Sequence, residues 1–384
     1  MERVNDLNNP SEMYSNKFGM EMTQNPDVWD KLAEKYKIDP SEIAQIDFNR
    51  SGVSLPNNEV QEDFRVRFKG ELFDNADSWF ALPVRGTNDT PFSATSGKLY
   101  FGNIEVGKTQ ELMLDTCESS YQRGPNLLNL NSRSRSNCGG CRACVHNYKN
   151  LYDGTVIKDS LGLNAKEEIA NFFDSQKLDV AKLKQIAVVT GLFGSEENVV
   201  EHMRVVDEVA KERGFAGELM YFGCEVNSEQ ALSELAKIDN FALIYALDNF
   251  TKREQLLAKT KSLITIETAK QTLDSAKDKG INTTIAYIAG IDPISDMEKG
   301  FIELKDSLTR FPVINIYQVQ TPGQATIIDE SAKRLEYYVQ SRAVLEDIFG
   351  DTGLRPRRWE NYRPLWYHSF GDELLPNNSY GENE

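Results

Sequence analysis

The segment QIAVVTGLFGSEENVVEHMRVVDEVAKERGFAGELMYFG, residues 185–223, contains one complete repeat of a pattern that recurs along much of this chain. Its apolar run at 185–191 predicts a buried strand, and residues 195–214 then show the spacing of an amphipathic helix. A serine at the start of that helix and a glycine at its end fit an N-cap and a C-terminal stop. A second apolar run at 217–223 predicts the next strand. This order indicates two parallel strands joined by a crossover helix.

The same pattern continues on both sides of this stretch. Further strands are predicted at 126–132, 241–247, 282–290 and 313–320, and further helices at 166–175, 227–238, 265–280, 295–308 and 329–350. Six strand–helix units predict an α/β fold, a partial (β/α)6 TIM-like barrel, with an open doubly wound sheet as the alternative. In either fold the chemistry belongs in the loops that follow the strands.

The regions outside these units differ in composition. The beginning of the chain is polar and rich in turns, with a helix predicted near 27–36 and a small β region near 63–105. We therefore expect an N-terminal accessory extension at 1–110, the partial barrel at 111–350 and a C-terminal tail or cap at 351–384. The aromatic and basic side chains of the tail are expected to pack against the barrel.

Charge and hydropathy limit the classes of partner. The chain has 384 residues and a formal net charge of −16. Because nucleic acids attract basic surfaces, this charge argues against a nucleic-acid partner and favours a small-molecule substrate. No run of about 18 apolar residues is present, so no membrane span is expected. The first residues lack the apolar stretch of a signal peptide, which predicts a cytoplasmic protein.

Three of the five cysteines lie together in NCGGCRACVHNY, residues 137–148. The spacing C-x2-C-x2-C is too tight for a secreted disulfide framework and is typical of a metal site in a reducing compartment. A four-iron cluster held by only three thiolates would keep one iron open to a further ligand. Zinc is the alternative, with His146 or Cys117 as a fourth ligand. The position of the loop, directly after a predicted strand, favours a catalytic centre.

Five segments resemble, in their order along the chain, the radical SAM superfamily and within it the biotin-synthase-like branch, over roughly residues 110–350. They are SRSRSNCGGCRACVHNY (132–148), TGLFGSEEN (190–198), YALDN (245–249), AYIAGID (286–292) and INIYQVQTPG (314–323). The resemblance implies a [4Fe–4S] cluster on Cys138, Cys141 and Cys144, with S-adenosylmethionine (SAM) bound to the open iron. It also implies reductive cleavage of SAM to a 5′-deoxyadenosyl radical, which abstracts hydrogen from a substrate.

The cysteine motif departs from that family in two places. The usual spacing is C-x3-C-x2-C, and this chain is one residue shorter between Cys138 and Cys141. The position before the last cysteine is often aromatic in the family but is Ala143 here. Two glycines between the first two cysteines allow the tighter loop. The sequence therefore predicts a divergent member.

The resemblance also implies which residues bind SAM. They follow three of the predicted strands. Where the family holds the amino group of SAM, this chain has Gly191, Gly194 and Glu196 (or its neighbour Glu197). Where the family holds the ribose it has Asp248 and Asn249, and where the family holds the adenine it has Gly290 and Ile291. The residues themselves leave other interpretations open. Acidic side chains stabilise a helix N-terminus, and polar residues and glycines are common in turns at strand ends.

Further candidates lie at the same edge of the predicted sheet. Cys224 and Glu225 follow the third strand; the thiol could donate hydrogen to a substrate radical, or could be an ordinary buried cysteine. Four other residues are expected to contact substrate, two on one face of the last predicted strand and two before the cysteines: Gln318, Gln320, Arg133 and Arg135. The arginines also suit carboxylate binding.

The function expected from the sequence is therefore that of a radical SAM enzyme with a biosynthetic role and a small-molecule substrate. A flavodoxin- or ferredoxin-type protein is the expected electron donor. Two alternatives stay open, a non-radical zinc metalloenzyme and a binding protein that senses iron or SAM.

Overall fold

The computed structural model of the chain describes residues 13–56, 65–72, 78–115, 120–123, 126–131, 141–144, 166–175, 178–357 and 360–376. Its main sheet has seven strands in the order β15-β14-β13-β12-β11-β10-β9. Their bounds are β9 Tyr121–Arg123, β10 Leu127–Leu130, β11 Gln185–Val189, β12 Glu218–Gly223, β13 Phe241–Asp248, β14 Asn282–Ala289 and β15 Val313–Ile316. Neighbours from β10 to β15 are parallel, and β9 is antiparallel to β10.

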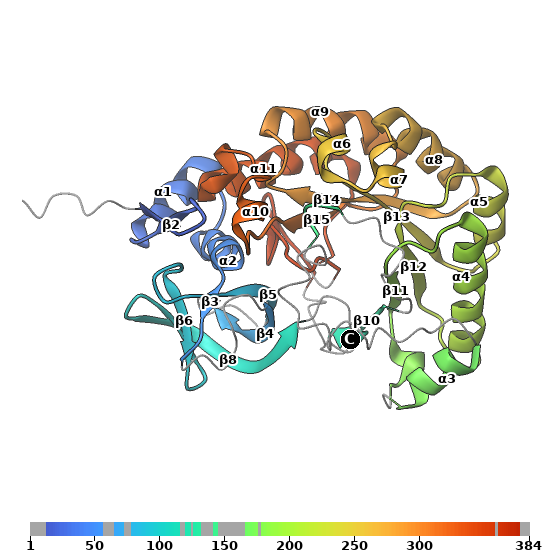
Figure 1. The fold of residues 1–384 in the computed structure, drawn as a ribbon, viewed down its shortest axis with the longest axis horizontal. Helices are drawn as coiled ribbons and strands as arrows, with labels where there is room; N and C mark the ends of the chain where they lie inside the picture. The colour runs from blue at the N-terminus through green and yellow to red at the C-terminus, as the bar shows by residue number, and fades with distance from the viewer. Residues whose placement is uncertain are drawn as a thin grey trace, which may run out of the picture.

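Helices cover the outer face of this sheet. Figure 1 shows α4, α5, α8 and α9 as an arc around the outside of the strands. The helices of this part are α3 Lys166–Ser175, α4 Glu196–Lys211, α5 Glu229–Leu235, α6 Arg253–Leu256, α7 Lys259–Ser262, α8 Ile266–Asp278, α9 Ile294–Leu304, α10 Pro322–Ala325 and α11 Leu335–Phe349. The predicted N-cap is present, since the Ser195 hydroxyl accepts from the Asn198 N–H at 3.3 Å. The structure confirms a mixed α/β fold with a parallel half-barrel sheet.

The strands of the sheet contribute to two separate apolar clusters. The larger cluster is the main core, which the strands share with the helices. The smaller cluster is rich in alanine and includes Ala187, Ala242, Ala246 and Ala286. Trp79, from the N-terminal part of the chain, packs against this smaller cluster. The N-terminal part is therefore in direct contact with the half-barrel sheet.

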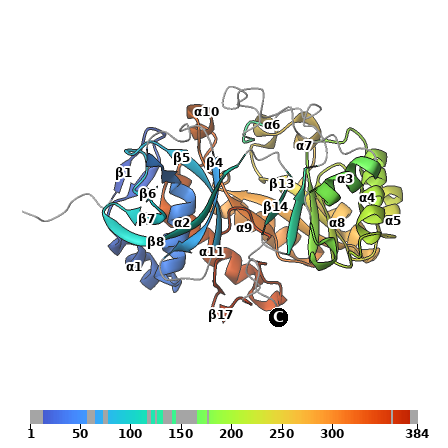
Figure 2. The ribbon, with the colours of Figure 1, turned by 90° about the horizontal axis from the view of Figure 1, so that it is seen from below.

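The N-terminal part contains a closed β-barrel in the strand order β3-β5-β4-β8-β7-β6. Its strands are β3 Val53–Ser54, β4 Arg65–Leu72, β5 Ser78–Arg85, β6 Phe92–Thr95, β7 Lys98–Phe101 and β8 Ile104–Asp115. The pair β1 Met13–Ser15 and β2 Glu21–Thr23 and the helices α1 Asp27–Tyr36 and α2 Pro40–Ser51 belong to the same end of the molecule (Figure 2). The sequence predicted α1 and a β region but not the closure of the barrel.

Three parts of the chain meet at one buried carboxylate. Glu42 of α2 forms an ion pair with Arg342 of α11 at 2.6 Å. The same carboxylate accepts from the backbone N–H groups of Tyr367 and Ser369 in the C-terminal tail. The tail also contains the hairpin β16 Ser369–Phe370 and β17 Glu373–Leu374. These contacts tie the N-terminal part and the tail to the half-barrel.

Within the described residues, the structure contains no helix whose length and hydropathy would suit a membrane crossing.

Candidate functional site

The cysteine loop lies at the carboxyl edge of the parallel sheet, against the segment that follows β13. The Arg142 N–H donates to the Leu256 carbonyl at 2.7 Å, and the Ala258 N–H donates to the Cys141 sulfur at 3.3 Å. Within the loop, the Cys144 N–H donates to the Cys141 carbonyl at 2.9 Å. Two of the three predicted ligands are thus close together, and the third, Cys138, lies outside the described residues.

The surroundings of Cys141 suit a sulfur ligand. Burial raises the pKa of its thiol, while the nearby Lys261 ammonium acts in the opposite direction. Metal binding removes the thiol proton and replaces it with a cation. Hydrogen bonds to the sulfurs of an iron–sulfur site help to set its reduction potential. The described part of the loop therefore fits a [4Fe–4S] cluster. In the described residues alone, no group of three His, Cys, Asp or Glu side chains could hold a metal ion.

Asp248, predicted to bind ribose, is paired with a lysine. Its carboxylate forms an ion pair with the Lys261 ammonium, and the two side chains are only 16% and 13% exposed. Asp248 ends β13 at a register shift and has a φ of 68°, in the left-handed region that non-glycine residues seldom adopt. Burial by itself lowers the pKa of Lys261, but the charges of Asp248, Cys224 and Cys141 and the hydrogen bond to Asp248 together raise it. Lys261 is therefore a buried cation close to Cys141.

Arg253 holds the segment after β13 together. Its guanidinium donates to the carbonyls of Leu247, Asn249 and Lys261. Asn249, the second predicted ribose ligand, is fully buried and its amide nitrogen donates to the Thr251 carbonyl. Its side-chain oxygen accepts no hydrogen bond from the described residues. Among the described residues, that oxygen is therefore a buried acceptor without a donor at this predicted site.

Each of the loops after β11 and β12 contributes a glutamate whose carboxylate accepts hydrogen bonds from the backbone of the other loop. Glu225, which follows β12, accepts from the Phe193 and Gly194 N–H groups, both at 2.7 Å. Glu196, at the start of α4, accepts in return from the Asn227 and Ser228 N–H groups before α5, at 2.6 and 2.9 Å. The structure thus brings together the predicted positions Gly194, Glu196 and Glu225. Both carboxylates bind backbone N–H groups of the neighbouring loop in this structure.

Cys224, the residue before Glu225, is buried, with 6% of its surface exposed. Burial raises the pKa of its thiol to about 11, against an opposing effect of Lys261. The charge of Cys141 adds to this rise in the pKa of Cys224, so the two thiols lie within electrostatic range. Cys224 is therefore protonated near neutral pH, as hydrogen donation from a thiol requires.

Gly290, predicted to lie against adenine, contacts tyrosines. Its φ is 119°, and a Cβ at this position would come within 2.9 Å of the Tyr338 hydroxyl. Its N–H donates to the Tyr337 hydroxyl at 3.2 Å. Ile291, the next residue, is fully buried. In this structure, the element that comes so close to Gly290 that only glycine fits is α11.

Asp292 is a residue that sequence reasoning did not single out. Its carboxylate accepts from the Phe250 and Thr251 N–H groups at 2.7 and 2.9 Å and from the Tyr287 hydroxyl at 3.0 Å. Asp292 follows the neighbouring strand, β14, and its hydrogen bonds hold the loop after β13 in place. The signal that could have found it is its place at the end of the segment AYIAGID, directly after a predicted strand.

The four residues predicted to contact substrate do not share one described location. β15 ends at Ile316, so Gln318 and Gln320 lie beyond the strand and its alternation does not apply to them. The Gln318 amide donates to the carbonyls of Asn49 and Ala81 and so links the half-barrel to the N-terminal part. Gln320 is 3% exposed, and its carboxamide has no partner among the described residues. The two remaining candidates, Arg133 and Arg135, lie outside those residues.

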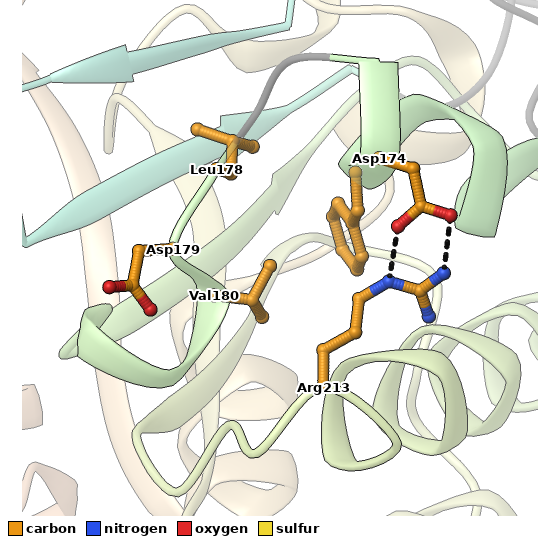
Figure 3. A pocket seen from close by; sticks show the side chains of 6 residues that line it. Asp174, Leu178, Asp179, Val180 and Arg213 are labelled. Carbon is orange, nitrogen blue, oxygen red and sulfur yellow. Dashed lines mark hydrogen bonds and ion pairs between the residues drawn. The ribbon is translucent and has the colours of Figure 1, made fainter.

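A shallow pocket elsewhere in the molecule is not this site. Figure 3 shows its lining, in which Asp174 and Arg213 form an ion pair through two hydrogen bonds of 3.0 Å. Leu178 and Val180, which also line it, precede β11. The pocket therefore lies toward the amino ends of the strands, at the edge opposite the cysteine loop.

No protein-family profile and no curated protein matches this chain. Among solved structures, SuiB from Streptococcus suis bound to S-adenosylmethionine is similar with 11% identity and a TM-score of 0.40, over 65% of this chain and 55% of that one. The FeFe-hydrogenase maturase HydG from Carboxydothermus hydrogenoformans has 13% identity and a TM-score of 0.43, over 66% and 63%. A glycoside hydrolase family 138 enzyme targeting pectin rhamnogalacturonan II has 12% identity and a TM-score of 0.27, over 74% and 36%. The chain thus spans less than two thirds of each of these proteins.

Proposed function

We propose that this chain is a radical SAM enzyme with a partial (β/α)6 barrel, a divergent member of the biotin-synthase-like branch, that cleaves SAM reductively and acts on a small-molecule substrate. The proposal rests on the ordered motifs of the sequence and on one structural observation. That observation is the docking of the cysteine loop on the segment after β13, through the Ala258 N–H and the Cys141 sulfur. When bound on Cys138, Cys141 and Cys144, a [4Fe–4S] cluster would supply the electron for cleavage.

The surrounding residues would hold SAM in place. The Glu225 carboxylate fixes the backbone at Phe193 and Gly194, so that this loop keeps one shape at the carboxyl edge of the sheet. The buried side-chain oxygen of Asn249 offers an acceptor for a ribose hydroxyl. Burial of the segment after β13 limits the access of water, which protects a reactive species from side reactions.

Cys224 would act later, on the substrate side. Burial raises the pKa of its thiol to about 11, so the thiol stays protonated well above neutral pH. A protonated thiol can give a hydrogen atom to a substrate radical, in which case its S–H bond breaks and a thiyl radical remains; a thiolate has no hydrogen atom to give. Gln320, whose carboxamide is buried without a partner among the described residues, is our candidate for substrate contact.

The test is the formation of 5′-deoxyadenosine. Protein reconstituted anaerobically with iron and sulfide is incubated with dithionite and SAM, and the product is quantified. We expect formation by the unmodified protein, loss in Cys144→Ala, and retention in Cys224→Ser, because Cys224 is not a proposed ligand. A fully loaded protein that forms no 5′-deoxyadenosine would favour a sensor of iron or SAM. Stoichiometric zinc in place of iron would favour the zinc enzyme.

A further inference from the structure

Exposed basic side chains lie on the cysteine loop and on the segment that packs against it. Arg142 of the loop is exposed, and so are Lys252, Lys259 and the apolar Leu263 of the segment that carries α6 and α7. We propose that these side chains, called here the basic face, bind an acidic electron-carrier protein. The proposal deepens the proposed function, on which it rests, by assigning the place where the electron enters.

The basic face is connected to the cysteines by backbone contacts. Arg142 lies next to Cys141 in the chain, and its N–H donates to the carbonyl of Leu256 in α6. Ala258, whose N–H donates to the Cys141 sulfur, directly precedes Lys259. A carrier protein bound to this face would therefore lie one layer of residues away from a cluster ligand. Figure 2 shows α6 and α7 at one edge of the molecule.

The charge of the basic face is opposite to that of the whole chain. The chain has 59 acidic and 43 basic residues. Lys252 and Lys259 have no acidic partner among the described residues, whereas many lysines elsewhere are paired: Lys166 with Glu208, Lys211 with Asp239, Lys237 with Glu234 and Lys279 with Glu229. The structure describes all of residues 252–259, and Glu254 is the one exposed acidic residue among them. An acidic partner would be repelled by most of the surface and attracted here.

The basic face also has an apolar contact point. Leu263 is 67% exposed and follows α7 directly. Protein interfaces commonly combine a small apolar centre with a charged rim, in which the charges steer association and the apolar area holds the complex. Duplex nucleic acid would require a far larger basic area. The chemistry of the face thus fits a small acidic protein.

The experiment compares two sources of electrons. The rate of 5′-deoxyadenosine formation is measured with dithionite and, separately, with a purified acidic flavodoxin in its reduced form. We expect the double variant Lys252→Glu/Lys259→Glu to keep the dithionite-driven rate. Its flavodoxin-driven rate at low salt should be roughly tenfold lower than that of the unmodified protein. Sodium chloride should slow the flavodoxin-driven reaction of the unmodified protein and have little effect on the variant. Lys184→Glu, an exposed lysine at the opposite edge of the sheet, is the matched control and should behave as the unmodified protein.

An unchanged flavodoxin-driven rate in the double variant, or an equal loss in Lys184→Glu, overturns the proposal. If dithionite yields no 5′-deoxyadenosine with the unmodified protein, the proposed function fails by itself. In that case the basic face is tested by direct binding of the same flavodoxin. Binding that is abolished by Lys252→Gln/Lys259→Gln supports the face, and binding that persists, or that the unmodified protein never shows, contradicts it.

Discussion

The backbone N–H of Ala258 donates to the Cys141 sulfur at 3.3 Å, a contact between residues that are 117 positions apart in the chain. Ala258 has φ −55° and ψ 147°, and the residue before it is extended. This backbone is compatible with proline, which would remove the N–H and place a ring carbon against the sulfur. The contact can therefore be tested without a change of backbone conformation.

Ala258→Pro should lower both the iron content and the midpoint potential of the reconstituted cluster. A hydrogen bond to a cluster sulfur stabilises the reduced state, so its loss makes reduction harder. Iron analysis and a potentiometric titration followed by EPR measure the two effects. Ala258→Gly keeps the N–H and serves as the control. Equal potentials in the proline and glycine variants would show that the contact has no influence on the cluster.

Lys261→Met should destabilise the protein by about 3–5 kcal/mol, because it leaves the Asp248 carboxylate buried and unpaired. Lys261→Met/Asp248→Asn removes both charges and should be less destabilised than the single variant. Urea unfolding of the apo-proteins measures this difference. The same loss of a cation near Cys141 should make the cluster potential more negative. A double variant no more stable than Lys261→Met would contradict the importance of the ion pair.

Cys224 should resist alkylation in the folded apo-protein. Burial raises the pKa of its thiol from 9.0 to about 11, so at pH 8 the thiolate fraction falls by roughly 100-fold. Iodoacetamide labelling, followed by mass spectrometry of the Cys224 peptide, should be slower by at least this factor than in urea-unfolded protein. Similar rates in folded and unfolded protein would exclude a buried, protonated thiol.

Glu42→Gln should destabilise the protein by about 3–5 kcal/mol at pH 7, because it breaks a buried ion pair. Burial raises the pKa of Glu42, but Arg342 and the hydrogen bonds from the tail prevail and lower it to about 2 from 4.5. A lowered folded-state pKa stabilises the protein above pH 4.5, and this contribution is lost as the pH falls toward 2. The difference in unfolding free energy between the protein and the variant should therefore narrow over that range.

The control for this variant is Glu34, an exposed glutamate of α1. Glu34→Gln should change the unfolding free energy by less than about 0.5 kcal/mol at any pH in the range. Urea unfolding at a series of pH values measures both variants. A Glu42→Gln effect that stays constant down to about pH 2 would contradict the lowered pKa.

The parallel sheet could be predicted because its strands are buried on both faces. Such strands form continuous apolar runs, as at 185–189 and 241–247, and several are followed by a helix with a recognisable N-cap. The N-terminal barrel could not be predicted in the same way. Its closure depends on the two-residue strand Val53–Ser54, which pairs with both β5 and β6. No local sequence pattern contains that pairing.

The site was predictable as a set of strand ends and not as a set of contacts. The residues after β11, β12 and β13 do lie at one edge of the sheet. Their partners come from other loops or from later in the same one: Lys261 for Asp248, Asn227 for Glu196 and Phe193 for Glu225. These pairs form because short segments between strands and helices fold against each other, and residue spacing does not encode that geometry. The early end of β15 similarly gives Gln318 and Gln320 different surroundings, although strand alternation predicted a shared face.

The proposed chemistry requires a cluster with one iron that no side chain occupies, held by Cys138, Cys141 and Cys144. The most direct measurement is the EPR spectrum of the reconstituted, dithionite-reduced protein before and after addition of SAM. We expect a reduced four-iron signal whose g values shift when SAM binds, and no such signal in Cys141→Ala. A four-iron signal that SAM leaves unchanged would mean that the cluster has no open iron and does not bind SAM.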